Sequence, residues 1–307
     1  MTGDRPGLEA QIHPEMYDYF VNLLDDIGMI DRISLILYTR GGVTLAAWSI
    51  VNLIQQFCGT FEVIVPSKAH SAGTLITLGA KAIVMTKQAT LGPIDPSVNG
   101  PLNPGISGGP PEARVPVSVE AVNGYIELGR SAMQRSEPQA IKDLLLKLTD
   151  SIHPLVLGDV FRSKSQIQML GRKLLESSGI KANRIPSLIS FLCSESGSHD
   201  YSIHRREARS LGLPIEKPND EFYAEIKRLY DDFAAELALT QVWNPIASLG
   251  SLPTLAYSNK RSLLESASGG SYYFVTEGSV QRLTIPGAGQ QIQDNRIFEG
   301  WRHEPAA

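Results

Sequence analysis

A serine at the junction of a predicted strand and a predicted helix is the residue of this sequence best placed to do chemistry. Ser71 stands in the stretch Ala-His-Ser-Ala-Gly-Thr at 69–74. The small neighbours favour a sharp turn that exposes the hydroxyl and directs the following backbone N–H groups toward one point. This suits a nucleophile beside an oxyanion site. An ordinary serine helix cap has the same local sequence, so both interpretations stay open for this stretch alone.

A pair of glycines ends the preceding predicted strand. Gly41 and Gly42 follow the apolar run Ile33–Tyr38. Two glycines let the backbone approach another segment closely and can place an N–H group beside an anionic oxygen. A tight turn with no function would have the same sequence, so this signal is weak by itself.

Alternating strands and helices would position both the Ser71 stretch and the pair Gly41-Gly42. Short apolar runs at 33–38, 61–65 and 82–85 predict buried parallel strands. Helical spacing predicts the helices between and around them, at 13–27, 44–57 and 71–80. The order, with short connections, predicts the α/β class: a parallel sheet covered by helices.

The later part of the chain has a different pattern. Residues 89–117 contain five glycines and seven prolines, which predicts a long exposed loop or flap. Two strands, 272–275 and 280–285, are predicted around a turn at Glu277-Gly278. Further helices are predicted at 119–135, 138–148, 165–177, 185–192, 205–211 and 220–239.

Together these motifs resemble a known family of serine peptidases. His-Ser-Ala-Gly-Thr-Leu at 70–75, Gly-Ala at 79–80 and Leu-Gly-Pro-Ile-Asp-Pro at 91–96 are similar to the Clp protease/crotonase superfamily. The closest likeness is to the serine dehydrogenase proteinase branch, which is related to the Clp proteolytic subunit and to signal peptide peptidase A. The resemblance covers about 33–213. It implies a core of stacked parallel β-α units, Ser71 as nucleophile, and oxyanion N–H groups from Gly42 (or Gly41) and Ala72.

A serine nucleophile needs a base, because its hydroxyl is a poor nucleophile near neutral pH. The resemblance to the Clp subunit implies His153, in an Ile-His-Pro stretch before a predicted helix, as that base. It also implies Asp200, seven residues before Glu207-Ala208, as the acid that orients the imidazole. His70 adjoins Ser71, but neighbours on an extended strand point to opposite faces.

The identity of the base stays open. Ser71 and His153 are 82 residues apart, far more than in the Clp subunit. His199 is the second candidate. A Ser–Lys dyad like that of signal peptide peptidase A would use Lys142 or Lys147, or Lys87, which is nearer in sequence. A lysine base must be partly desolvated to lower its pKa.

Composition limits the other possibilities. The chain has 307 residues, 28 basic and 32 acidic, for a net charge of −4, so no strong basic field favours nucleic acid. Two cysteines, Cys58 and Cys193, cannot make a disulfide framework and fit a reducing compartment. No signal peptide and no run of about 18 apolar residues is visible. We therefore expect a cytoplasmic protein without a membrane span, a metal or a cofactor.

These observations lead to one hypothesis with two alternatives. We expect a core over 1–213, interrupted by an insertion at about 88–150, and a C-terminal extension over 214–307 for packing or oligomerisation. The resemblance implies an ATP-independent serine peptidase that cleaves peptide bonds through an acyl-enzyme on Ser71, and a homo-oligomer. The alternatives are an inactive Clp-like assembly protein and a Ser–Lys dyad peptidase.

Overall fold

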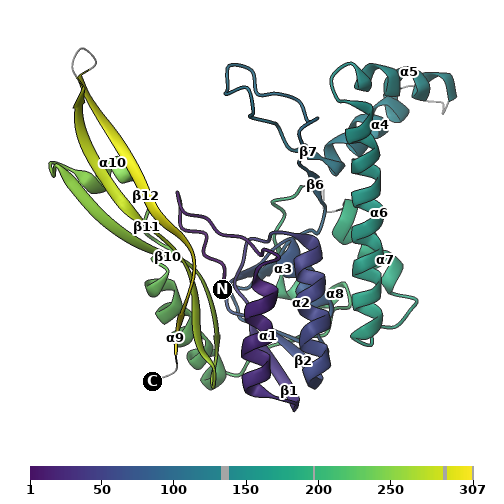
Figure 1. The fold of residues 1–307 in the computed structure, drawn as a ribbon. Helices are drawn as coiled ribbons and strands as arrows, with labels where there is room; N and C mark the ends of the chain where they lie inside the picture. The colour runs from purple at the N-terminus through teal and green to yellow at the C-terminus, as the bar shows by residue number, and fades with distance from the viewer. Residues whose placement is uncertain (133–137, 196–197, 286–288, 306–307) are drawn as a thin grey trace. The chain divides into compact units, whose positions relative to one another are not determined.

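The chain folds into two compact units. The computed structural model describes residues 1–132, 138–195, 198–285 and 289–305 (Figure 1). The first unit is Met1–Leu91 with His204–Ala307, and the second unit is Gly92–Ile203. The expected domain boundary at 213/214 lies inside the first unit, and the expected insertion at 88–150 overlaps part of the second.

A parallel sheet is the centre of the first unit. Its order is β1-β2-β4-β9, with all neighbours parallel, which confirms the predicted α/β class. All four residues of β4 are buried, and this explains its continuous apolar run. The strands are β1 (Ile30–Ile36), β2 (Cys58–Val65), β4 (Ala82–Met85) and β9 (Ile215–Glu216).

Helices cover both faces of this sheet. Helix α2 packs against both α1 and α3, in front of the sheet in Figure 1. On α9, Ile226 packs with Ile64 of β2 and Val84 of β4, so α9 covers the face to which these alternate residues point. The helices of this unit are α1 (Met16–Ile27), α2 (Thr44–Phe57), α3 (Ala72–Leu78), α8 (Arg205–Ser210), α9 (Asp220–Glu236) and α10 (Pro245–Leu249).

A long antiparallel sheet forms the C-terminal part of the first unit, built from β10 (Thr254–Ser266), β11 (Gly270–Ile285) and β12 (Gly289–Glu304). The predicted turn at Glu277-Gly278 is wrong, because β11 runs through it as one strand with a register shift at that point. A Cβ on Gly278 would lie 2.4 Å from the Asn295 carbonyl oxygen. The glycine therefore permits close strand approach at a bulge and makes no turn.

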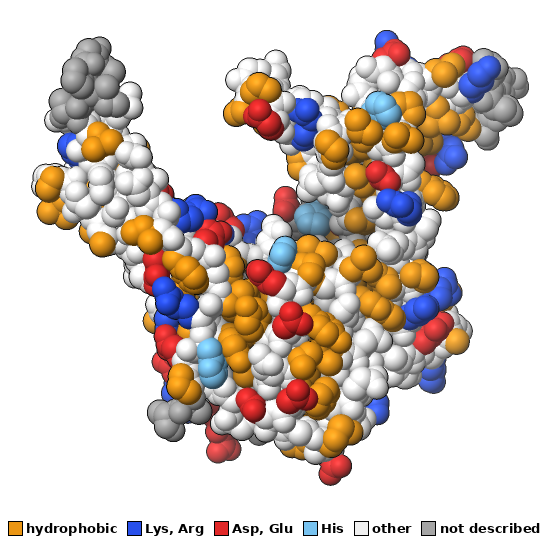
Figure 2. All heavy atoms as spheres, in the orientation of Figure 1, with side chains coloured by type: hydrophobic (Ala, Val, Ile, Leu, Met, Phe, Trp, Pro, Cys, Tyr) orange, Lys and Arg blue, Asp and Glu red, His pale blue; other side chains and the backbone are white. Residues whose placement is uncertain are grey.

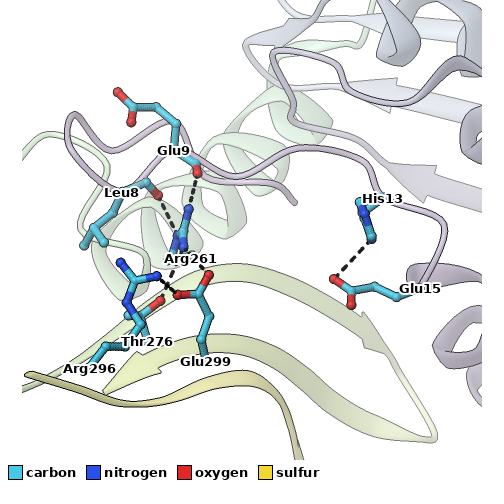
Figure 3. A network of polar contacts seen from close by, with 8 residues as sticks. All are labelled: Leu8, Glu9, His13, Glu15, Arg261, Thr276, Arg296 and Glu299. Carbon is cyan, nitrogen blue, oxygen red and sulfur yellow. Dashed lines mark hydrogen bonds and ion pairs between the residues drawn. The ribbon is translucent and has the colours of Figure 1, made fainter. Parts of the chain in front are cut away.

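Arg261 fastens the N-terminal segment to this C-terminal sheet (Figure 3). Its guanidinium donates hydrogen bonds to the carbonyl oxygens of Leu8 and Glu9 and to the Thr276 hydroxyl. It also lies 3.2 Å from a carboxylate oxygen of Glu299. One side chain on β10 thus holds a loop from the start of the chain against β11 and β12.

The second unit is mostly helical. It contains α4 (Val119–Ala132), α5 (Pro138–Thr149), α6 (Pro154–Ser177), α7 (Ile185–Ser190), a π-helical turn (Phe191–Glu195) and the first residue of β8 (Ile203–His204). The glycine- and proline-rich stretch 89–117 was expected to be a loop. It begins with β5 (Thr90–Leu91), which belongs to the first unit, and also contains a short antiparallel ladder between β6 (Ser97–Val98) and β7 (Val117–Ser118). Helix α6 begins eleven residues before its predicted start.

Replacing Gly278 tests the bulge in β11. We expect Gly278→Ala to lower the free energy of unfolding by about 1–3 kcal/mol, because the new methyl group meets backbone atoms that cannot move aside freely. Gly158→Ala is the control: a Cβ there has nothing within 4 Å, and alanine in a helix interior gains about 0.5–1 kcal/mol over glycine. Urea unfolding followed by circular dichroism measures both. A Gly278→Ala midpoint equal to that of the wild type would contradict the account.

Candidate functional site

Ser71 occupies a strained turn between a strand and a helix. Strand β3 (Lys68–Ala69) pairs in parallel with β5, and Ala69 also bridges Thr39. Helix α3 begins one residue after Ser71. The Ser71 backbone has φ 51° and ψ −116°, which makes it one of two non-glycine residues with positive φ in the described chain. Such a conformation persists only where the surroundings impose it, and it is found most often at functional sites.

The Ser71 hydroxyl does not cap α3. Ser71 stands at the N-cap position, yet its side chain makes no capping hydrogen bond. Within the first unit, no described residue forms a hydrogen bond with its Oγ. The side chain is partly exposed. The structure therefore excludes the helix-cap interpretation of this serine and leaves its oxygen available.

Gly41 lies directly against Ser71. A Cβ on Gly41 would be 2.8 Å from the Ser71 Cβ and 3.2 Å from its Oγ, and the φ of Gly41 is +122°. The N–H of Gly41 donates to Thr39 Oγ1 at 2.9 Å, so it is already used. Gly41 therefore gives Ser71 the space it needs, and its own N–H is engaged elsewhere.

Gly42 and Ala72 keep their backbone N–H groups unused. A Cβ on Gly42 would lie 2.3 Å from the carbonyl oxygen of Ile12, so only glycine fits there. Within the described part of the first unit, the N–H groups of Gly42 and Ala72 have no hydrogen-bond acceptor. For Ala72 this is expected, because the first N–H groups of a helix have no partner inside it. The choice between Gly41 and Gly42 that the sequence left open thus favours Gly42 as a donor.

The His70 side chain is directed toward β5. Its Nε2 is 2.9 Å from Thr90 Oγ1, and its backbone N–H donates to the Thr39 carbonyl oxygen. Strand β3 ends at Ala69, before both residues, and the His70 imidazole contacts Thr90.

The predicted base and acid do not contact each other. His153 is the N-cap of α6, and its Nδ1 accepts a hydrogen bond from the Leu155 N–H at 3.2 Å. Asp200 is exposed, and its N–H donates to Ser198 Oγ. Among the described residues of the second unit, no hydrogen bond or ion pair joins His153 to Asp200. Their catalytic roles stay a prediction.

A different histidine of the second unit has an acid partner. His199 Nδ1 lies 2.9 Å from Asp95 Oδ1, whose side chain is only 4% exposed, while that of His199 is 52% exposed. The hydrogen bond to Asp95 raises the pKa of His199 and outweighs the lowering effect of burial. No described residue of the second unit forms a hydrogen bond with Nε2. An imidazole held by a carboxylate at Nδ1, with Nε2 open, has the arrangement of a general base.

The sequence offers His199 as the second candidate base but gives Asp95 no predicted role. The sequence signal that could have indicated it is the position of Asp95 between Ile94 and Pro96, in the motif at 91–96. Such a residue is rarely buried without a partner. The pairing itself links residues 104 positions apart in sequence, so no local pattern indicates it.

The candidate lysine bases are solvent-exposed. Lys142 and Lys147 lie on α5, where Lys147 is 3.1 Å from Asp150. Lys87 places its Nζ 4.7 Å from the ring centroid of Tyr223. None of the three has the desolvated setting within its own unit that a lysine base requires.

Neither cysteine is suited to nucleophilic chemistry. Burial raises the pKa of Cys193 to about 12, helped by Glu120 and Asp95, and burial also raises the pKa of Cys58. Among the described residues, no three His, Cys, Asp or Glu side chains gather as a metal site. No helix in the same residues combines the length and apolar character that crossing a bilayer requires.

Comparison with known families bears on the Ser71 region. Residues 26–107 match the family of ClpP-like SDH-type serine proteinases. This confirms the resemblance inferred from the sequence, for the segment that the match covers. That segment includes Ser71, both glycines and Asp95, and it includes neither His153 nor His199.

Two curated relatives come from Methanocaldococcus jannaschii. The uncharacterized protein MJ0137 is 29% identical over 199 residues, which are 64% of this chain and 58% of that protein. The uncharacterized protein MJ1495 is 41% identical over 66 residues, which are 22% of this chain and 23% of that protein. The chain thus matches less than two thirds of the length of either relative.

Solved structures with similar folds are distant. A variant of the 1510-N membrane-bound stomatin-specific protease is 19% identical, with a TM-score of 0.41 over 69% of this chain and 78% of that one. ClpP1 from Listeria monocytogenes is 15% identical, with a TM-score of 0.37 over 69% of this chain and 89% of that one.

The Asp95–His199 pair predicts a specific titration. We expect Asp95→Asn to lower the pKa of His199 toward its ordinary value of 6.5, because the main cause of the upward shift is removed. NMR titration of the His199 imidazole signals in both proteins measures this. A His199 pKa that is the same in both proteins would contradict the pairing.

The same pair makes stability depend on pH. A histidine whose pKa is raised by folding stabilises the protein fully below its unfolded pKa, about 6.5, and this contribution is lost as the pH rises through the folded value. The loss of unfolding free energy caused by Asp95→Asn should therefore be larger at pH 5 than at pH 9. Urea unfolding of both proteins at the two pH values tests this, and an equal loss at both would contradict it.

Proposed function

We propose that this protein is a serine peptidase that acts without ATP and uses Ser71 as its nucleophile. The observation that carries the proposal is the strained Ser71 turn. Among the described residues of the first unit, none forms a hydrogen bond with its Oγ, and Gly41 lies against it. A capping or packing role requires neither feature. The family match over 26–107 supports the same chemistry.

The reaction would proceed through an acyl-enzyme. Ser71 Oγ forms a bond to the carbonyl carbon of the peptide, and its proton passes to a base. The carbonyl oxygen becomes an oxyanion that accepts hydrogen bonds from the N–H groups of Gly42 and Ala72. The base returns the proton to the leaving amine, and the C–N bond breaks. Water then attacks the ester and releases the second product, with Ser71 restored.

We further propose His199, oriented by Asp95, as the base. The 2.9 Å contact and the buried Asp95 carboxylate support this assignment. Chain connectivity supports it too: Asp95 follows Leu91 by four residues, so their Cα atoms are at most about 14 Å apart. Leu91 pairs with Ala69, two residues before Ser71. His153 with Asp200, and a lysine dyad through Lys142, are the competing assignments.

Covalent labelling tests the nucleophile. A fluorophosphonate probe should label Ser71, as located by mass spectrometry of the digested protein, and Ser71→Ala should abolish labelling. Ser118→Ala is the matched control, since Ser118 Oγ accepts a hydrogen bond from the Ala121 N–H and acts as a helix cap. Labelling that persists in a folded Ser71→Ala protein would leave an assembly protein as the better interpretation.

Three substitutions separate the candidate bases. We expect His199→Gln to lower kcat for peptide hydrolysis by about 10²–10⁴-fold, the usual contribution of a general base. His153→Gln and Lys142→Met should retain activity within a factor of about two, because neither side chain then takes part. If His153→Gln loses most of its activity while His199→Gln stays active, His153 and not His199 is the general base.

The pH profile gives a second measure of the base. His199 acts only when Nε2 is unprotonated, so kcat/KM should fall at low pH with the raised pKa of this residue. Asp95→Asn should move that acidic limb to lower pH. An unmoved limb would exclude His199 as the titrating group.

Assembly into a homo-oligomer is part of this proposal, because the resemblance implies it. Sedimentation velocity on the full chain at micromolar concentration tests it. A single monomeric species would contradict this part while leaving the assignment of Ser71 intact.

A further inference from the structure

A cavity of about 680 Å³ runs along the outer edge of the parallel sheet, within the first unit. Strand β1 forms one wall, and the end of β10 with the two residues after it, Leu263 to Ser268, forms the other. Figure 2 shows hydrophobic side chains gathered in the region between α1 and the C-terminal sheet. The apolar residues that line the cavity from the two covering helices are Phe20, Leu23, Leu24 and Ile27 of α1, and Leu229 and Phe233 of α9.

The backbone of β1 presents unused groups to this cavity. Leu37, just after β1, donates its N–H to the Ile64 carbonyl oxygen, toward β2. Because backbone groups of a strand alternate sides, the N–H groups of Ser34 and Ile36 point away from β2. Within the described part of the first unit, neither N–H has an acceptor. An unpaired edge of this kind is a template for a further strand.

Met1 and Thr2 already occupy one end of this space and pair there through their backbone. The Thr2 N–H donates to the Tyr38 carbonyl oxygen at 3.0 Å, and Thr2 forms an antiparallel bridge with Ser262 of β10. The Leu263 N–H donates to the Met1 carbonyl oxygen at 2.9 Å. At this end the space is therefore one strand wide, and both walls form hydrogen bonds with the inserted backbone. The cavity continues from Met1 along β1.

We infer that this cavity is a binding site for an extended segment of another polypeptide, which adds as a strand between β1 and β10. Backbone hydrogen bonds to Ser34 and Ile36 would provide affinity, as in other cases of strand addition. The bound segment would carry apolar or β-branched side chains toward both faces, since α1 covers one and α9 the other. Proline would be excluded where the segment donates to β1 or β10. This inference goes beyond the proposed peptidase activity and requires no reaction at Ser71.

A peptide pair tests backbone pairing directly. The probe is a fluorescein-labelled Lys-Val-Thr-Val-Thr-Val-Lys peptide, and its matched control is the same peptide with N-methyl groups on alternate amides. Fluorescence anisotropy is measured with the full chain carrying Ser71→Ala, so that cleavage cannot interfere. We expect the methylated peptide to bind at least about tenfold more weakly, because each blocked donor costs a backbone hydrogen bond. Equal affinities would overturn strand addition and indicate an apolar pocket for a lipid-like molecule.

A pair of protein variants tests the edge of β1. Ser34→Pro removes the outward N–H, which β2 does not use, and Ser34→Ala keeps it. We expect Ser34→Pro to weaken binding by about tenfold and Ser34→Ala to bind like its parent. Hydrogen exchange should show the amides of Ser34 and Ile36 becoming protected when the peptide binds. If Ser34→Pro does not fold, the peptide pair and the hydrogen-exchange data still show whether the peptide pairs with β1.

No binding, or binding without protection at Ser34, would overturn the inference. Either result is independent of Ser71, since the parent protein already lacks the nucleophile. A labelled Ser71 in the wild type together with no peptide binding would leave the proposed function standing and exclude this site.

Discussion

The close approach of the Gly41 backbone to Ser71 constrains the whole candidate site. A side chain at Gly41 would overlap the Ser71 side chain, and a side chain at Gly42 would overlap the Ile12 backbone. The Thr39 hydroxyl fixes the turn by accepting the Gly41 N–H. This arrangement, with the unfavourable φ of Ser71, leaves the hydroxyl uncapped next to unused N–H groups. Strain of this kind costs about 1–3 kcal/mol, which the buried α3 and its packing offset.

The residues of the proposed mechanism belong to different parts of the chain. The first unit contains Ser71, Gly42 and Ala72, and the second contains the pair Asp95 and His199. The motif at 91–96 spans the boundary between the two units. Its first residue, Leu91, ends β5, which pairs with β3, and its fifth residue is the buried Asp95. The first unit also contains the open edge of β1. A peptide at β1 would be bound through backbone hydrogen bonds, whereas Ser71 would react with a single peptide carbonyl group.

Local signals in the sequence predicted the core strands and pointed to Ser71 as the candidate nucleophile. The bounds of α2 and β4 agree with the apolar pattern, and small residues mark the turn at Ser71. Long-range contacts could not be predicted: the Asp95–His199 pair joins residues 104 positions apart and depends on tertiary packing. Strands β10 and β12 were missed because many of their residues are polar and exposed, so no apolar alternation distinguishes them from loops.

The most direct test of the central claim is a crystal structure of the protein after reaction with a fluorophosphonate, whose phosphoryl oxygen stands in for the oxyanion. The account predicts a bond from phosphorus to Ser71 Oγ, with that oxygen about 2.7–3.1 Å from the N–H nitrogens of Gly42 and Ala72. Phosphorus bound to another residue, or a phosphoryl oxygen facing solvent while both N–H groups stay unpaired, would contradict it.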